Sequence, residues 1–286
     1  MGNSTVKTGE KGAWISISAY IFLAAFKLIM ANLGNSEALK ADGLNNFTDV
    51  FASVAILIGL KISKKPADEN HKYGHSRAET ISSLIASFIM FFVGVQVVMD
   101  SFQKFYKPGE GQPELFTSFV ALFSAIAMFY VYRINIKLSK EIGSKALYSA
   151  AQDNKSDALV SIGTAVGIIG AFFGIGWLDP LTAALVGLII CHTAWDIFKN
   201  AAHDLTDGFE VQTLKEFEDT INDTPGVKFT KDIKARLYGN QTAVDATIFV
   251  DSNLSIIQGH AISELVEQRL FEYHKIGHVH IHIEPI

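Results

Sequence analysis

The sequence predicts an α-helical membrane protein with six transmembrane helices, followed by a small α+β domain. Three observations lead to this fold class. Apolar stretches long enough to cross a bilayer recur before residue 209. Hydrophobic residues make up 49% of the 286-residue chain and charged residues 19%, less than the ~25% of a soluble domain. Residues 1–208 carry 17 basic and 17 acidic side chains, whereas residues 209–286 carry 7 and 12. We therefore predict a transmembrane domain at 1–208 and a second domain at 209–286.

The composition also excludes several classes of protein. A chain this apolar does not belong to the disordered proteins. One cysteine in 286 residues cannot build a disulfide scaffold or a cysteine-based zinc site. The net charge of −5 argues against a nucleic-acid partner.

Six stretches are candidates for membrane spans, because about 20 mostly apolar residues cross a bilayer core as a helix. They are Ala13–Leu33, Ala41–Ile62, Thr80–Phe102, Leu115–Ile134, Leu147–Ile175 and Trp177–Phe198. The second and fifth carry acidic residues in their interiors. We retain both, because an ionisable residue inside a span indicates function. No cleavage pattern follows the first stretch, so we expect a retained span rather than a signal peptide.

The basic residues of the loops predict the orientation, because they are enriched on the cytoplasmic side of a membrane. They concentrate in two loops, after the second and fourth spans, as Lys61, Lys64, Lys65, Lys72 and Arg77, and as Arg133, Lys137, Lys140 and Lys145. The even-numbered spans therefore end in the cytoplasm. We expect an integral membrane protein, surrounded by lipid, with both termini in the cytoplasm.

The segment after residue 208 follows other periodicities. Val211–Asn222 and Ser255–Phe271 have helical patterns, whereas Lys231–Leu237 and Val244–Val250 alternate as half-buried strands do. Val279–Ile283 is a further short strand. The order α-β-β-α-β predicts a two-layer domain with its helices on one face of a sheet.

Four polar residues inside two spans form the candidate site. Asn45 and Asp49 are four residues apart in the second span, as are Asp153 and Asp157 in the fifth, so each pair shares a helix face. At 1.5 Å per residue, Asp49 and Asp157 lie ~18 Å and ~15 Å from the cytoplasmic ends of their spans. If these faces meet, they offer one amide oxygen and three carboxylates at mid-membrane depth.

Three buried carboxylates require compensation, because each costs several kcal/mol without a partner. A divalent cation is the simplest partner, and protons are the next when the cation is absent. The alternative is an ion pair with Lys155, which lies two residues from each acid and so points to another face. Oxygen ligands suit hard cations such as Mn²⁺, whereas nitrogen and sulfur suit Zn²⁺ better.

At this point the residues resemble the cation diffusion facilitator family. The matching segments are Ala41-Asp42-Gly43-Leu44-Asn45 with Asp49, the loop Asp68–Glu79, Asp153 with Asp157, Trp177-Leu178-Asp179-Pro180, and His282-Ile283-Glu284-Pro285. Each motif is weak alone, but together, in order over nearly the whole chain, they are highly specific.

The resemblance implies a homodimeric secondary transporter that exports divalent metal from the cytoplasm in exchange for protons, by alternating access. It further implies a metallochaperone-like cytoplasmic domain, a location in the bacterial plasma membrane and a transport site at Asn45, Asp49, Asp153 and Asp157. Zinc-transporting members carry a histidine in place of Asp153. We therefore expect Mn²⁺ as the substrate, with no cofactor, and with Zn²⁺, Fe²⁺ and Co²⁺ as alternatives.

The resemblance also suggests two further metal sites. Asp68, His71 and His75 match a loop site of bacterial zinc members, and both histidines reach one metal if the segment is helical. His260, His282 and Glu284 match positions of the cytoplasmic domain, where this chain replaces further histidines by Lys231 and Thr247. A lysine there repels a cation, so a reduced site is expected. The alternatives are a solvated loop that binds nothing, and side chains that only form hydrogen bonds in the dimer interface.

Arg77 and Asp207 match positions that pair at the junction of membrane and cytoplasm in the family, where they hold the dimer. The alternative is an arginine at the membrane surface and an exposed aspartate. Four glycines of the fifth span, at positions 163, 167, 170 and 174, form two small-xxx-small pairs that allow close helix packing.

Two other classes of protein compete with this interpretation. An intramembrane aspartyl protease also needs two aspartates on separate spans. Proteins of that class carry a Gly-x-Gly-Asp pattern, and neither Asp153 nor Asp157 stands in such a pattern. A metal-gated channel would conduct without proton coupling. We expect a transporter and not an enzyme.

Overall fold

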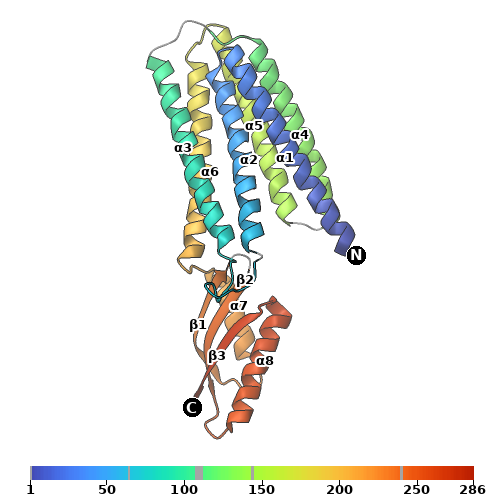
Figure 1. The fold of residues 1–286 in the computed structure, drawn as a ribbon, viewed down its shortest axis with the longest axis vertical. Helices are drawn as coiled ribbons and strands as arrows, with labels where there is room; N and C mark the ends of the chain where they lie inside the picture. Colours follow the sequence, from blue (N-terminus) through green and yellow to red (C-terminus); the bar gives the residue numbers. More distant parts are fainter. Residues whose placement is uncertain (1, 64, 107–111, 143–144, 239–240) are drawn as a thin grey trace. The chain divides into compact units, whose positions relative to one another are not determined.

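The computed structural model describes residues 2–63, 65–106, 112–142, 145–238 and 241–286. In these ranges the chain forms eight α-helices and three β-strands (Figure 1). The first six helices are α1 (Gly2–Leu33), α2 (Glu37–Ser63), α3 (Ala78–Tyr106), α4 (Phe116–Ile142), α5 (Lys145–Phe172) and α6 (Leu178–Leu205). They fall on the six predicted spans. The helix α1 begins 11 residues earlier than predicted, α4 and α6 end 8 and 7 residues later, and the other ends differ by four residues or fewer.

Five of these helices are long and apolar enough to cross a membrane, judged over the described residues. They are α1, α3, α4, α5 and α6. The remaining helix, α2, carries Asp42, Asn45, Asn46 and Asp49 in its interior. These polar residues lower the hydropathy of α2, so that hydropathy identifies it poorly as a span. The same residues make α2 a candidate for function.

The chain divides into two compact units, which we describe separately. One comprises Met1–Ala55 and Ile85–Asp196, and the other comprises Ile56–Leu84 and Ile197–Ile286. In the first unit, α1, α4 and α5 lie side by side (Figure 1). Small buried side chains such as Ala31, Ala121 and Ala165 fill the contact between them. The candidate residues of α2 and α5 all belong to this unit.

The second unit contains the predicted α+β domain, built as α7 (Val211–Asn222), β1 (Phe229–Tyr238), β2 (Gln241–Val250), α8 (Ile256–His274) and β3 (His278–Pro285). The sheet order is β1-β2-β3, with β1 antiparallel and β3 parallel to β2. The parallel pair requires a crossover connection, which α8 provides. The predicted order α-β-β-α-β is therefore the observed one.

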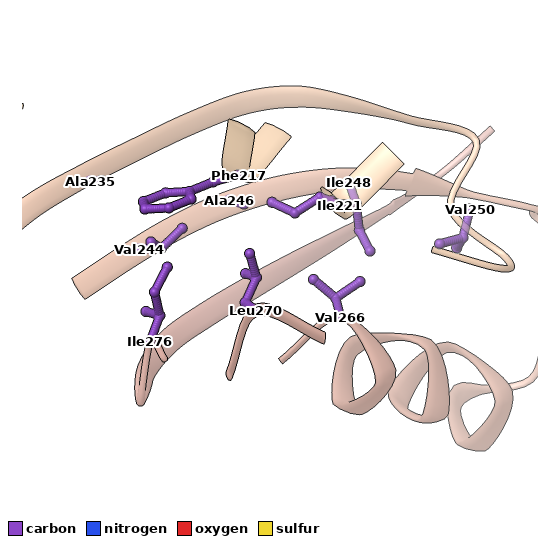
Figure 2. Packing of buried hydrophobic residues seen from close by; sticks show 10 residues of the cluster. All are labelled: Phe217, Ile221, Ala235, Val244, Ala246, Ile248, Val250, Val266, Leu270 and Ile276. Atoms are coloured by element: carbon purple, nitrogen blue, oxygen red, sulfur yellow. The ribbon is translucent and has the colours of Figure 1, made fainter. Parts of the chain in front are cut away.

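The core of this domain lies on one face of the sheet. Alternate residues of β2, from Val244 to Val250, are buried, as the period of two requires. Figure 2 shows Phe217 and Ile221 of α7 and Val266 and Leu270 of α8 packed on the same cluster. Both helices thus cover a single face, as the sequence predicts.

The ends of α8 have clear causes in the sequence. Ser255 accepts a hydrogen bond from the backbone of Gln258, whose side chain in turn accepts one from the Ser255 backbone. This capping box satisfies two donors at the start of the helix. Lys275 ends the helix in a left-handed conformation with φ of 60°. The helix therefore begins directly after Ser255 and ends directly before Lys275, and its buried residues pack against the sheet.

Candidate functional site

The structure brings Asn45 of α2 and Asp157 of α5 together. Asn45 Nδ2 donates a hydrogen bond to Asp157 Oδ1 at 3.0 Å. The two residues are only 7% and 8% exposed. Because Asn45 donates with its nitrogen, its side-chain oxygen stays available as a ligand.

The other two acids lie one helical turn away, on the same faces. Asp49 is half-buried and Asp153 is exposed. Asp49 Oδ2 is buried and has no hydrogen-bond partner in the described part of the chain. The carboxylates of Asp49, Asp153 and Asp157 lie close enough to repel one another electrostatically. Among the described residues, no basic side chain lies within ion-pair distance of these three carboxylates, and their oxygens do not gather within 4.8 Å of one another. A cation or protons can compensate their charge.

Lys155 does not provide that partner. It is exposed, and its ammonium lies 6.0 Å from the ring centre of Tyr132. Among the described residues, no acid lies within ion-pair distance of Lys155. The alternative of a structural ion pair between Lys155 and the neighbouring aspartates therefore has no support in the geometry.

Asp157 has a second donor that the sequence does not single out. The hydroxyl of Tyr20, in α1, donates to Asp157 Oδ2 at 2.6 Å. Asn154 Nδ2 donates to the same hydroxyl at 2.9 Å, and Asn135 of α4 donates to Asn154 Oδ1 at 3.0 Å. This buried network joins α1, α4 and α5, and it fixes the orientation of the Asp157 carboxylate. A neutral polar side chain inside an apolar span is the sequence signal for such a network, but a tyrosine is common there and does not stand out.

The loop between α2 and α3 brings Asp68, His71 and His75 together. One ligand atom from each lies within 4.8 Å of the others, which no other group of three or more His, Cys, Asp or Glu residues achieves in the described ranges. Asp68 Oδ1 lies 3.2 Å from His71 Nδ1, and Asp68 Oδ2 lies 3.5 Å from His75 Nε2. The segment is not helical, so turns and not a helix face bring the side chains together.

Backbone amides shape this loop around Asp68. The backbone N–H groups of His71 and Asn70 donate to Asp68 Oδ1 at 2.7 and 2.9 Å. The bond from His71 is the main reason that the pKa of Asp68 lies below its ordinary value. The carboxylate therefore stays charged as a potential ligand at pH values where an ordinary aspartate begins to take up a proton.

The three residues predicted for the cytoplasmic site do not form such a group in the described chain. Glu284 accepts two hydrogen bonds from the ammonium of Lys231, at 2.8 and 2.9 Å. His282 Nε2 lies 3.9 Å from Glu284, while His260 lies 3.4 Å from Glu264 instead. Lys231 thus neutralises the carboxylate that a metal would need, in addition to repelling the metal.

Arg77 and Asp207 form an ion pair, as the resemblance implies for their positions. Arg77 Nη2 donates to Asp207 Oδ1 at 2.6 Å. The guanidinium also lies 5.0 Å from the ring centre of Tyr238 in β1. Both contacts lie inside the second compact unit, so the pair links the start of α3 to the segment that follows α6.

Comparisons with known proteins cover both parts of the chain. The cation efflux transmembrane domain matches residues 13–206, and the cytoplasmic domain of cation efflux proteins matches residues 210–286. Manganese efflux system protein MneS of Bacillus subtilis (strain 168) is 50% identical, over 98% of this chain and 97% of the relative. Two more proteins of that strain match. The uncharacterized transporter YdbO is 46% identical, over 98% of this chain and 97% of its own, and manganese efflux system protein MneP is 30% identical, over 100% and 99%.

Proposed function

The chain belongs to the cation efflux family, and we propose that it exports Mn²⁺ from the cytoplasm in exchange for protons. Membership of this family makes it an integral membrane transporter of metal cations rather than an enzyme, which excludes the intramembrane protease. The choice of metal, the exchanged ion and the direction across the membrane are the parts that we propose.

The donor set of the proposed transport site is the main support for Mn²⁺ as the substrate. Asn45, Asp49, Asp153 and Asp157 offer oxygen atoms only, and oxygen ligands favour Mn²⁺ over the nitrogen-preferring Zn²⁺. The names of two relatives, at 50% and 30% identity, agree with this choice. Fe²⁺, Co²⁺ and Zn²⁺ are the competing substrates.

Proton exchange follows from the surplus of negative charge in the site. Three carboxylates belong to the proposed site, and protons can compensate their negative charge when the metal is absent. Binding of a divalent ion displaces those protons, because only deprotonated carboxylates act as ligands. In our proposal, the same carboxylates bind the metal on its way outward and protons on their way inward. Bound metal and bound protons cannot occupy these carboxylates at the same time.

The remaining roles extend this proposal. The basic loops orient both termini toward the cytoplasm, in a bacterial plasma membrane. Two copies of the chain form a homodimer through the cytoplasmic domain, which the Arg77–Asp207 pair supports at the membrane junction. The division of the chain into a transport domain at 1–208 and a cytoplasmic domain at 209–286 belongs to the same proposal.

Transport by the mutated site is the direct test. In vesicles with an acidic lumen and the cytoplasmic face outward, the wild type should accumulate Mn²⁺, whereas Asp49→Ala and Asp157→Ala should abolish accumulation because each removes a ligand. Asp196→Ala, an exposed aspartate of α6, is the matched control and should transport normally. Unchanged Mn²⁺ uptake by both site variants, with normal insertion, would contradict the site.

The loop and cytoplasmic sites are secondary proposals with a common test. Titration calorimetry of the full-length protein with Mn²⁺ should lose one binding event in Asp68→Asn, because this change removes a charged ligand and retains the loop geometry. If Asp68→Asn binds as the wild type does, the loop is a solvated turn. Replacing His260, His282 and Glu284 together by alanine should lower binding if the cytoplasmic site exists, and unchanged binding argues against it.

A further inference from the structure

A lysine is completely buried inside the transmembrane unit. Lys27, six residues before the end of α1, has a side chain that is 0% exposed. Its ammonium lies 2.9 Å from Asp42 Oδ1, 2.7 Å from Asn46 Oδ1 and 2.9 Å from Ser161 Oγ. These three partners come from α2 and α5, the helices that carry the proposed transport site.

The three oxygens form a small cage around one positive charge. An ammonium has three hydrogens, and each has one oxygen partner here. Asp42 Oδ1 also accepts a hydrogen bond from Ser161 at 3.2 Å, whereas Asp42 Oδ2 is buried without a partner in the described residues. Without the lysine, the cage would present an uncompensated carboxylate and two neutral oxygens, which is a donor set for a cation.

The cage lies next to the transport site on one side. Asp42 precedes Asp49 by seven residues in α2, which is ~10 Å along the helix. Ser161 follows Asp157 by four residues in α5, which is ~6 Å. The two helices run in opposite directions in the proposed topology, so both displacements lead toward the extracellular side. The cage is therefore the next group of oxygens on the way out.

The structure is tightly packed beyond the cage. Ala31, Leu39 and Ile168 belong to one buried apolar cluster of α1, α2, α4 and α5. Ser36 donates to Asp179 at 2.6 Å, which ties the start of α2 to α6. Lys27 thus lies between the proposed transport site and this buried apolar cluster.

We propose that Lys27 is a tethered cation that fills this outer cage and blocks the transported metal from moving outward until the ammonium leaves. The proposal rests on the proposed exchange of metal for protons. A metal ion in the transport site and the ammonium in the cage repel each other. A metal ion that moves on into the cage would need the oxygens that the ammonium occupies. The block keeps metal release coupled to the movement of α1 relative to α2 and α5.

The variants must separate this role from a merely structural ion pair. Lys27→Met alone leaves Asp42 charged and unpaired, which destabilises a buried site strongly. The double variant Lys27→Met with Asp42→Asn removes both charges, and replacing both members of a buried pair is often tolerated. Ser161→Ala removes one oxygen of the cage and leaves the ion pair in place. Lys40→Met is the matched control, because Lys40 pairs with Asp100 at a partly exposed position of α2.

The test measures Mn²⁺ flux and proton flux in the same proteoliposomes that contain the full-length protein. Wild type and Lys40→Met should show one fixed ratio of protons to Mn²⁺. The double variant should pass Mn²⁺ with severalfold fewer protons, and Ser161→Ala should show an intermediate ratio. A wild-type ratio in the folded double variant, or in Ser161→Ala if the double variant does not fold, would overturn the block by Lys27. A wild type that moves Mn²⁺ without protons would instead refute the proposed exchange, and with it this inference.

Discussion

At the scale of single residues, the carboxylate of Asp157 has a partner for each oxygen. Asn45 donates to Oδ1 and Tyr20 donates to Oδ2. These donors stabilise the charged carboxylate, but a metal that binds either oxygen must compete with them. The hydroxyl of Tyr20 therefore acts as a positioning group for the site rather than as a ligand in this structure.

Tyr20→Phe tests that role. The change removes a hydrogen bond to a charged group, which should lower the stability of the metal-free protein by about 1.5–3 kcal/mol. Bound Mn²⁺ compensates the carboxylate directly, so the metal-bound protein should lose less. The increase in melting temperature on adding Mn²⁺ should accordingly be larger in Tyr20→Phe than in the wild type.

A matched control distinguishes this effect from a general loss of stability. Tyr130→Phe alters an exposed tyrosine of α4 and should leave both melting temperatures unchanged. If Mn²⁺ raises the melting temperature of Tyr20→Phe and of the wild type equally, the hydroxyl does not compete with the metal for Asp157.

Residue types and helical spacing predict Asn45, Asp49, Asp153 and Asp157 as a group, because charges inside apolar spans stand out. They do not predict Tyr20 or Lys27 as partners of those helices. Tyr20 is ordinary in an apolar span, and the partner of a buried lysine depends on how α1 packs. Such contacts join residues more than a hundred positions apart, and only the folded arrangement reveals them.

At the scale of elements, the glycines of α5 divide into two groups. A Cβ atom on Gly167 would clash with Thr182 of α6, and one on Gly170 would clash with Leu178. A Cβ atom on Gly163 would meet nothing within 4 Å, whereas Gly174 lies beyond the end of α5, in a turn with φ of 104°. The small-xxx-small pattern thus marks close packing only at its two central glycines.

Gly167→Ala and Gly163→Ala should therefore differ in sign. Alanine favours a helix interior by about 1 kcal/mol relative to glycine, so Gly163→Ala should be neutral or stabilising. Gly167→Ala should destabilise, because α6 must move away from α5. Thermal unfolding of the full-length protein in detergent measures both, and equal shifts would contradict the packing described between α5 and α6.

The elements themselves are well predicted by periodicity. The helix Val211–Asn222 has the predicted ends, and the remaining elements of the cytoplasmic domain differ from prediction by a few residues. The loop at Asp68 is a different case, because hydrogen bonds from the backbone of Asn70 and His71 shape it. Such turns depend on a side chain that caps its own backbone, so ligand spacing alone suggests a helix that does not form.

At the scale of the whole molecule, we propose a division of the chain into a transport domain and a cytoplasmic domain, in agreement with the family matches at residues 13–206 and 210–286. The neutral apolar part matches the transmembrane domain, and the acidic part matches the cytoplasmic domain. Composition predicts this division because the bilayer and the cytoplasm require different surfaces. The compact units follow another boundary, since the ends of α2, α3 and α6 group with the cytoplasmic domain. Chain composition does not contain that information.

The all-oxygen donor set of the transport site should select Mn²⁺, and Asp153 is the residue whose substitution tests this selectivity. Fluxes of Mn²⁺ and Zn²⁺ should be measured side by side, against a proton gradient, for the wild type and for Asp153→His. The wild type should prefer Mn²⁺, and the variant should shift toward Zn²⁺ because it supplies an imidazole nitrogen. A wild type that transports Zn²⁺ but not Mn²⁺, or a variant with unchanged preference, would contradict the account.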